Sequence, residues 1–526
     1  MRARLQHLES QLLSRSPLQR DRYDEDESLE SDRTGSEGSQ WLTGSTSSSS
    51  FGMISPGFNG SSTSDSTISG NHLGNMPVSL FLDFEYFQRA NLKLSKPHIT
   101  IPPDVLRYLC QENMVIETAT EYFNTIHVWL PFISKKRMDL GIPTQNPGPD
   151  LAMLFLAMKP CISDLKETQE NSLYTICKNF LFTLERGGLM TLLGLQASIL
   201  VALFEHIHAI YPAAWMSIGA CARYAELLGV NSSTEAYSVL RKVTSWTEIE
   251  ERRRTWWALF ALDRLSVTGN ERSYALPRPT GEGRLPGDDD SWNFGDPKKG
   301  GIGHVISTDY RIHQSAFARL CQAALYIDRA RDYTKIRGDL DADAVAEIMS
   351  FSEDLERFCS LIEEKETENS IAFTSLGARN LANSALFLVL NRLACPETVS
   401  PESNYHMEGG AKNPVEASVL GRAVEIIEQA SNKFHARACE MQQHIYDLPP
   451  KDISTLLSTF SPFSLDAIYV SAVTLLWLWL ESGDETYRTK ANEIETHLER
   501  IGQRWGLAKA YSKLVRDYVS LFGPYD

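Results

Sequence analysis

Apolar residues recur at helical spacing along most of this chain. From Ser79 onward they fall at positions i, i+3 and i+4 in successive segments, and strand-like alternation between turn residues is nearly absent. We therefore expect an all-α fold, a large multi-helix domain. The pattern predicts helices over 105–130, 149–159, 172–186, 190–210, 213–229, 248–266, 310–332, 340–364, 372–395, 414–438, 463–481 and 485–521.

The first 78 residues follow a different pattern. Leu5, Leu8 and Leu12 form a short a/d seam, so residues 1–13 are either a dimerising coiled-coil fragment or one amphipathic helix that frays. Residues 14–78 are acidic and then rich in Ser and Gly, which predicts a disordered arm serving as a linker. The predicted organisation is completed by a main domain over 79–450 and by C-terminal helices over 451–526 that pack on it.

Charge and cysteine spacing exclude several classes of protein. The 526 residues carry a net charge of −16, which argues against binding nucleic acid by electrostatics alone. The eight cysteines contain no C-x-x-C pair, which excludes a zinc finger or zinc ribbon. No signal peptide is evident, and the longest apolar runs are shorter than the roughly 20 residues that span a bilayer. We expect an intracellular, reduced protein with no membrane partner.

The segment 247–266 has the best-defined local pattern. Thr247 and Glu250 form a capping box that predicts a helix start, and Glu250 with Arg254 predicts a surface pair. Asp263 lies on an otherwise apolar face and needs a cation, for which Arg223 is the candidate. We interpret this as a structural ion pair; a catalytic acid is the alternative, but no second carboxylate or histidine accompanies Asp263.

Other charged and histidine-containing motifs give little sign of chemistry. The run 252–254 of three arginines is either a nucleic-acid patch or nuclear signal, or a solvated, salt-bridged helix face, which we favour. His206 and His208 are two residues apart, so they diverge on a helix and do not form a zinc pair. No nucleophile elbow, phosphate-binding loop or dinucleotide motif is present. We expect no catalytic residues, no metal ligands, no cofactor in this chain and no enzyme activity.

Several segments, in this order, resemble the regulatory domain of fungal zinc-cluster transcription factors, also called the middle homology or fungal-specific transcription factor domain. The similar stretches are EYFNTIHVWLPFISKKRM (121–138), LGLQASILVALF (193–204), AWMSIGACARYAELLGV (214–230), EERRRTWWALFALDR (250–264) and the Pro-rich acidic loop ALPRPTGEGRLPGDDDSW (275–292). The resemblance covers roughly residues 80–450. Each motif alone is only moderately specific for this family. The presence of all of them in this order makes the resemblance strong.

The resemblance implies an all-helical domain that regulates RNA polymerase II transcription in the nucleus and supports homodimers or heterodimers with a related factor, sometimes responding to a small-molecule inducer. It also implies that the matching motif residues are architectural and fix helix packing. These residues are Tyr122, His127, Pro131, Arg223, Gly229, Arg253, Arg254, Trp256, Trp257, Asp263 and Arg264.

The residues that hold zinc and contact DNA in this family cannot be assigned here. Such factors carry six cysteines that hold two zinc ions, yet no cysteine precedes Cys110. We expect DNA contact to come from a missing N-terminal module or from a partner chain. The alternative function is a ligand-sensing or protein-interaction module that acts in trans by heterodimerising. An inducer pocket is expected among the helices 213–229, 248–266 and 463–481.

Overall fold

The computed structural model confirms the all-α fold class. The residues it describes are 76–90, 92, 94, 97–139, 148–163, 172–231, 239–240, 243, 245–269, 272–296, 301, 303–336, 340–368, 376–394, 414–446 and 448–522. Within these ranges no strand occurs, and the only β-type pairing is an isolated bridge between Arg284 and Val305. The predicted helix 1–13, with Leu5, Leu8 and Leu12, and nearly all of the predicted arm lie outside the described residues.

The N-terminal half of the molecule is built around α11, a helix of which every residue except Ser198 is buried. The Thr191 side chain caps α11 by accepting a hydrogen bond from the Gly194 N–H at 3.0 Å. Around α11 pack α8, α10 and α12. The helices of this half are α2 (Ser79–Leu82), α3 (Phe84–Arg89), α4 (Pro103–Leu109), α5 (Met114–Asn124), α6 (Ile126–Trp129), α7 (Lys135–Asp139), α8 (Pro149–Ile162), α10 (Leu173–Arg186), α11 (Leu192–Ile207) and α12 (Ala213–Leu228).

The C-terminal half is built around α18, which packs against α16, α17, α19 and α21. A second layer forms where α22 packs on α19 and α21 and α23 packs on α22. The short helix α14 (Asp289–Phe294) packs on α7 of the N-terminal half. The helices of the C-terminal half are α16 (Ala316–Thr334), α17 (Ala342–Glu368), α18 (Leu376–Ala394), α19 (Pro414–Tyr446), α20 (Pro450–Thr459), the 3-10 turn η3 (Pro462–Ser464), α21 (Leu465–Ser482), α22 (Glu485–Ile501) and α23 (Gly506–Phe522).

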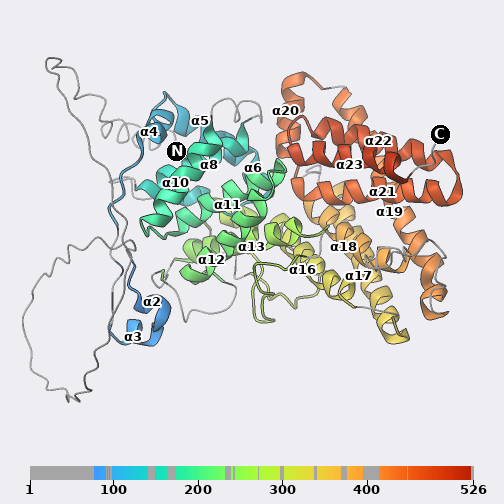
Figure 1. Cartoon of the computed structure of the whole chain (residues 1–526), viewed down its shortest axis with the longest axis horizontal. Helices are drawn as coiled ribbons and strands as arrows, with labels where there is room; N and C mark the ends of the chain where they lie inside the picture. The colour runs from blue at the N-terminus through green and yellow to red at the C-terminus, as the bar shows by residue number, and fades with distance from the viewer. Residues whose placement is uncertain are drawn as a thin grey trace, which may run out of the picture.

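One helix, α13 (Trp246–Ser266), joins the two halves, because it packs on α11 and α12 on one side and on α16 on the other. Figure 1 shows the blue-to-green helices gathered on one side of the molecule, the yellow-to-red helices on the other, and α13 between them. Smaller contacts of α20 with α6 and of α23 with α11 also cross the junction.

Several predicted helix boundaries are wrong. The predicted helix 105–130 is three helices, α4, α5 and α6, because Asn113 adopts a left-handed conformation with φ of 60° and a turn at Thr125 breaks the chain again. The predicted helix 485–521 is two helices, α22 and α23. The sequence pattern did not predict α2, α3, α14 or α20.

The expectation that every apolar run is too short to cross a membrane is corrected in one place. The helical segment Pro462–Ser482 has 21 residues and a mean hydropathy of 1.6, enough to span a bilayer by length and composition. Of its most apolar window, 72% is buried inside the protein against neighbouring helices. We interpret it as a core helix of the C-terminal half. The division at residues 79 and 450 remains a prediction.

Candidate functional site

The start of α13 differs from the predicted capping box. The helix begins at Trp246 after Ser245, and the Ser245 side chain makes no capping hydrogen bond. Glu250 does not reach back to the helix start. Its carboxylate accepts hydrogen bonds from Arg253, from Arg254 Nε at 3.0 Å and from the Gly287 N–H at 2.7 Å. Glu250 therefore connects α13 to the loop that follows it.

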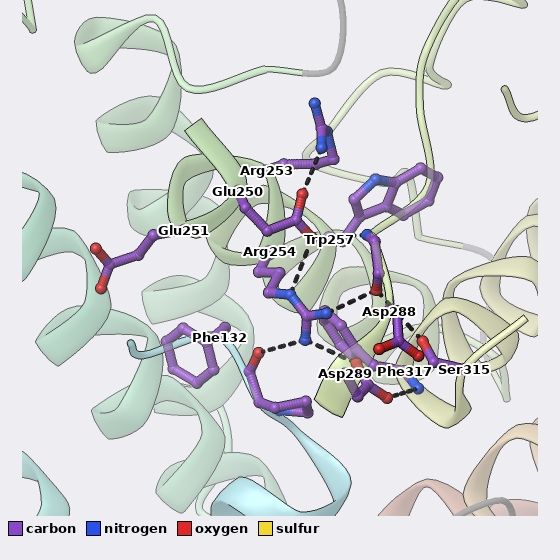
Figure 2. A network of polar contacts seen from close by, with 12 residues as sticks. Phe132, Glu250, Glu251, Arg253, Arg254, Trp257, Asp288, Asp289, Ser315 and Phe317 are labelled. Atoms are coloured by element: carbon purple, nitrogen blue, oxygen red, sulfur yellow. Dashed lines mark hydrogen bonds and ion pairs between the residues drawn. The ribbon is translucent and has the colours of Figure 1, made fainter. Parts of the chain in front are cut away.

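The Arg254 guanidinium lies at the centre of a buried network that we call the Arg254 clamp (Figure 2). The side chain is 0% exposed, and it donates to Glu250, to the Pro131 carbonyl at 3.2 Å and to the Gly287 carbonyl at 2.8 Å. Its Nη1 also lies 2.8 Å from the Asp289 carboxylate. A charge removed from water is tolerated only with such complete pairing. The clamp therefore fixes α13, the segment at Pro131 and the N-terminus of α14 relative to one another.

Aromatic rings and a second acid extend the clamp. The Arg254 guanidinium lies 5.0 Å from the centre of the Trp292 ring and 5.4 Å from that of Phe317, close enough for cation–π attraction. Asp289 also accepts a hydrogen bond from the Phe317 N–H at 3.0 Å, at the start of α16 (Figure 2). A single arginine thus connects both halves of the molecule.

Glu251 makes a parallel set of buried contacts on the neighbouring side of α13. It is 0% exposed and accepts from the Ser134 N–H at 3.0 Å, from Gln196 Nε2 at 3.2 Å and from Arg137. The interpretation of the run 252–254 as a solvated face is therefore wrong for Arg254, and the predicted surface pair of Glu250 with Arg254 is buried. Their partners come from segments distant in sequence, which the local pattern does not reveal.

The predicted ion pair between Arg223 and Asp263 is also wrong. The Arg223 side chain is 84% exposed and pairs with Glu226 on the same helix. Asp263 instead pairs with its neighbour Arg264 at 2.7 Å and accepts from the N–H groups of Ala275 and Leu276 at 3.0–3.1 Å. Burial raises the pKa of the Asp263 carboxyl, and Arg264 and the two N–H groups oppose that effect.

Arg264 forms a second clamp nearly three turns after Arg254 along α13. Its guanidinium binds Asp328 of α16 at 2.9 Å and lies against the rings of Phe260 and Tyr274, at 3.8 and 4.2 Å from their centres. Asp263 and Arg264 thus secure the loop after α13 and the helix α16. The contacts of Asp263 with Arg264, Ala275 and Leu276 are structural ones.

The remaining motif residues also lie in packing positions. Trp256 stacks on Phe260 with 5.1 Å between ring centres, and Trp257 Nε1 donates to the Arg284 carbonyl at 2.8 Å. Tyr122 is fully buried with its ring edge-on to Phe123 and His127. Gly229 ends α12 with φ of 70°, a conformation that favours glycine.

The buried histidines are neutral structural groups. His127 Nε2 lies 2.9 Å from Asn293 Oδ1, and burial lowers the pKa of His127 to about 4. Burial likewise lowers the pKa of His206 to about 4 and that of His208 to about 3. His206 and His208 do not lie together in any group of metal-ligand type within the described residues.

A cavity of about 870 Å³ lies against α10, α11 and α12, and no residue of the Arg254 clamp lines it. We call it the α10–α12 cavity. The short helices α2 and α3 cover part of it, and its walls are mostly apolar, as is usual for small-molecule pockets. Its lining residues are Leu80, Phe81, Phe84, Lys178, Leu181, Phe182, Leu184, Glu185, Leu189, Met190, Gly194, Ser198, Val201, Ser217, Ala220, Cys221, Arg223, Tyr224, Glu226, Leu227 and Val239.

The polar groups in the cavity wall are few and mostly engaged. Lys178 Nζ lies 2.9 Å from both Ser217 Oγ and the buried carboxylate of Glu205. The Tyr224 hydroxyl accepts from the Thr191 N–H at 2.9 Å. The cavity therefore suits an apolar molecule with few polar groups. Of the three helices expected to hold an inducer, α12 lines this cavity, and its lining includes no residue of α13 or α21.

Comparison with known proteins gives the same assignment as the motifs. The model of the fungal specific transcription factor domain matches residues 119–324, which include the clamp, α11 and α12. Transcription factor BOA15 of Botryotinia fuckeliana (strain B05.10) is 34% identical over 180 residues, and the aligned region covers 98% of that protein and 34% of this chain. The chain belongs to this family of fungal transcription factors.

Longer family members match over smaller parts of their length. The pigment biosynthesis transcriptional activator pigB of Monascus ruber is 27% identical over 241 residues, 42% of this chain and 44% of that protein. The depudecin biosynthesis cluster-specific transcription activator DEP6 of Fusarium langsethiae is 29% identical over 153 residues, 27% of this chain and 25% of that protein. This chain thus spans less than half of both proteins. No solved structure matches the chain.

Family membership confirms the resemblance seen in the motifs. The matched domain is a transcription-regulator domain, and the named relatives are transcription factors rather than enzymes. The roles of the individual motif residues remain predictions, although each one except Arg223 makes contacts of the expected architectural kind.

Sequence reasoning missed two features. The α10–α12 cavity depends on α2, α3 and α10, which carry none of the family motifs. A group of three side chains on α19 and α22, His435, Cys439 and Glu493, has the ligand types of a metal site. The spacing of four between His435 and Cys439, at the end of the predicted helix 414–438, was the available signal for that group.

Proposed function

We propose that this chain is the regulatory body of a nuclear transcription regulator that controls RNA polymerase II transcription. In this proposal, DNA contact comes from a module outside residues 1–526 or from a partner chain. The observation that carries it is the family match over 119–324, which contains the Arg254 clamp. The net charge of −16 supports a role separate from direct phosphate binding.

An apolar small molecule is the proposed effector, and the α10–α12 cavity is its proposed site. Helical domains hold ligands between packed helices, and a volume of about 870 Å³ lies in the range of ligand pockets. The covering helices carry exposed apolar side chains, including Phe81 at 61% exposure. An apolar ligand would bury this surface, so that its binding would hold α2 and α3 against α10 and α12.

A reporter assay tests both parts of the proposal. The full chain is joined to an unrelated DNA-binding domain, and transcription from its operator is measured in a fungal host with and without extracts of apolar metabolites. We expect the fusion to change transcription and an apolar fraction to alter that change. A fusion without effect on transcription, in any fraction, would contradict the proposed function.

Two substitutions on one helix separate the effector site from the fold. Ala220 is exposed and lines the cavity, so Ala220→Trp should fill it without disturbing the core. Met216 is 61% exposed on the same helix and does not line the cavity, which makes Met216→Trp the matched control. We expect Ala220→Trp to keep reporter activity and lose the response to the effector, whereas Met216→Trp keeps both. Equal responses in the two variants would place the effector elsewhere.

The second candidate function is a trans-acting regulator that heterodimerises with a related factor and does not contact DNA. The seam of Leu5, Leu8 and Leu12 favours it. Deletion of residues 1–13 should then abolish co-purification with a related factor expressed in the same cells. Unchanged co-purification would remove this candidate.

A further inference from the structure

The seam between α19 and α22 is lined by polar side chains that pair in order along both helices. The Tyr487 hydroxyl donates to Glu428 at 2.7 Å. One turn further on, Lys490 Nζ lies 2.7 Å from Asn432 Oδ1. Residue numbers rise together on the two helices, so α19 and α22 run parallel here. The seam lies outside residues 119–324, the part that matches the family domain.

At the next turn of the seam three potential metal ligands converge. His435 and Cys439 lie four residues apart on one face of α19, and Glu493 faces them from α22. The Cys439 Sγ atom lies 3.4 Å from His435 Nε2 and 3.6 Å from Glu493 Oε2, and His435 Nε2 is in direct contact with the same oxygen. One ligand atom from each residue thus lies within 4.8 Å of the others.

Two of these three separations are those of a tetrahedral zinc site. Bonds of about 2.0–2.3 Å from Zn²⁺ to nitrogen, oxygen and sulfur place neighbouring ligand atoms about 3.5 Å apart. Both Cys439 distances already fit. Only the contact between His435 and Glu493 must open, and the Glu493 side chain is 47% exposed and can rotate outward. A thiolate, an imidazole and a carboxylate together favour Zn²⁺ over Mg²⁺ or Ca²⁺.

We propose that His435, Cys439 and Glu493 bind one Zn²⁺ ion that fastens α19 to α22. The ion takes the place of the Cys439 thiol proton, which passes to the buffer. His435 binds the ion through Nε2 as its Nδ1–H tautomer, so the hydrogen on Nε2 leaves for the buffer while Nδ1 takes one up, and Glu493 binds as the carboxylate. Three protein ligands leave a fourth position for water. Gln442 Nε2 donates to the backbone carbonyl of Glu493 at 3.1 Å and orients that part of α22. The site is separate from the six-cysteine cluster that the family resemblance implies.

A cobalt titration of the full chain, purified without a histidine tag and stripped with chelator, tests the proposal. Co²⁺ in such a site gives intense tetrahedral d–d bands and a thiolate-to-cobalt charge-transfer band. We expect both to saturate at one equivalent per chain and to disappear when Zn²⁺ is added. We also expect Zn²⁺ to raise the unfolding temperature. A chain that shows no charge-transfer band would overturn the proposal.

Three variants locate the ion. Cys439→Ala should abolish the charge-transfer band, and Glu493→Gln, at an exposed position, should weaken Co²⁺ affinity more than the roughly 10–100-fold typical of outer-shell changes. Cys110→Ser, at the other half-buried cysteine among the residues that the structure describes, is the matched control and should keep the band unchanged. A band that survives Cys439→Ala, or one that Cys110→Ser removes, places the ion elsewhere and contradicts the proposal. Unfolding curves in chelator confirm that each variant is folded.

Discussion

The Arg254 clamp and the seam between α19 and α22 use the same types of side chain to hold helices together, but they differ in burial. In the clamp, Arg254 and Glu250 are 0% exposed, and their partners lie on several distant segments. In the seam, Glu493 is 47% exposed and each contact joins the same two helices. A buried charge has a high desolvation cost unless it is fully paired, whereas an exposed one can exchange its partner for water or an ion.

This difference separates fixed structure from surfaces available to ligands. The clamp has no room for a ligand, since the guanidinium is already bonded to two carboxylates and two carbonyls. In the seam, the potential metal-ligand atoms lie near solvent. The α10–α12 cavity has a mostly apolar wall that a ligand can contact. We therefore expect substitutions in the clamp to change stability and substitutions in the seam or cavity to change binding.

The largest expected effect is that of Arg254→Met. The substitution removes one of the two guanidinium groups that pair with buried Glu250 and the cation beside Asp289, so the free energy of unfolding should fall by about 3–5 kcal/mol. Denaturant unfolding of the full chain, followed by circular dichroism, measures it. Arg223→Met is the matched control, because the Arg223 side chain is 84% exposed, and it should change stability by less than about 0.5 kcal/mol. If the two substitutions lowered the free energy of unfolding equally, the buried arginine of the clamp would contribute no more to stability than an exposed arginine.

The second effect is a loss of stability in acid that depends on His127. Burial lowers the pKa of His127 to about 4, and Arg254 and Lys135 further disfavour the protonated ring. The unfolded chain, with a histidine pKa near 6.5, therefore binds more protons between these values, and stability falls as the pH falls through that window. At pH 5 the contribution is roughly 2 kcal/mol relative to pH 7.

His127→Gln isolates this contribution from other groups. The raised pKa values of Asp263 and Asp466 act in the opposite direction, so the total pH dependence of the wild type is a sum of opposing effects. The variant should lose less stability than the wild type between pH 7 and pH 5. His444→Gln, on the exposed side of α19, is the control. A pH profile that His127→Gln leaves unchanged would show that His127 is not held neutral by the fold.

Hydrophobic periodicity predicted the helical class well because apolar residues recur at helical spacing along the long helices. The segments 190–210, 213–229 and 248–266 correspond closely to α11, α12 and α13. The break of 105–130 into three helices depends on local backbone conformation at Asn113 and Thr125, which apolar spacing does not report.

The partners of the charged residues in α13 could not be predicted for a different reason. Glu250 and Arg254 have the helical spacing of a surface pair, and only Pro131, Gly287 and Asp289, brought close by the fold, make their burial possible. The same reasoning chose Arg223 for Asp263, although Arg264 was its neighbour in sequence. The spacing of residues along a helix can indicate that a charged side chain needs a partner. It does not identify that partner when the fold brings it from a distant segment.

The third effect tests a neutral hydrogen bond beside the clamp. Trp257 is 0% exposed, and its Nε1 donates to the Arg284 carbonyl at 2.8 Å. Trp257→Phe removes that bond and leaves a small void, so the free energy of unfolding should fall by about 1–3 kcal/mol. The exposed Trp215, at 41%, supplies the control Trp215→Phe, with an expected change below about 0.5 kcal/mol. If Trp257→Phe lowers the free energy of unfolding by about 4 kcal/mol or more, losing a neutral hydrogen bond would cost as much as losing the Arg254 charge. The large effect of Arg254→Met could then not be attributed to a buried charge.

The smallest effect is expected in the seam. Lys490 lies 2.7 Å from Asn432 but stays half-exposed, so Lys490→Met in chelator should cost less than about 1 kcal/mol. A double-mutant cycle with Asn432→Ala gives the coupling energy directly, and we expect a few tenths of a kcal/mol. The corresponding cycle between Glu250 and Arg254 should exceed it severalfold. A seam coupling as strong as that of the clamp would mean that α19 and α22 are already fixed by their own side chains. Weak coupling instead leaves the two helices free to be tightened by a bound ion.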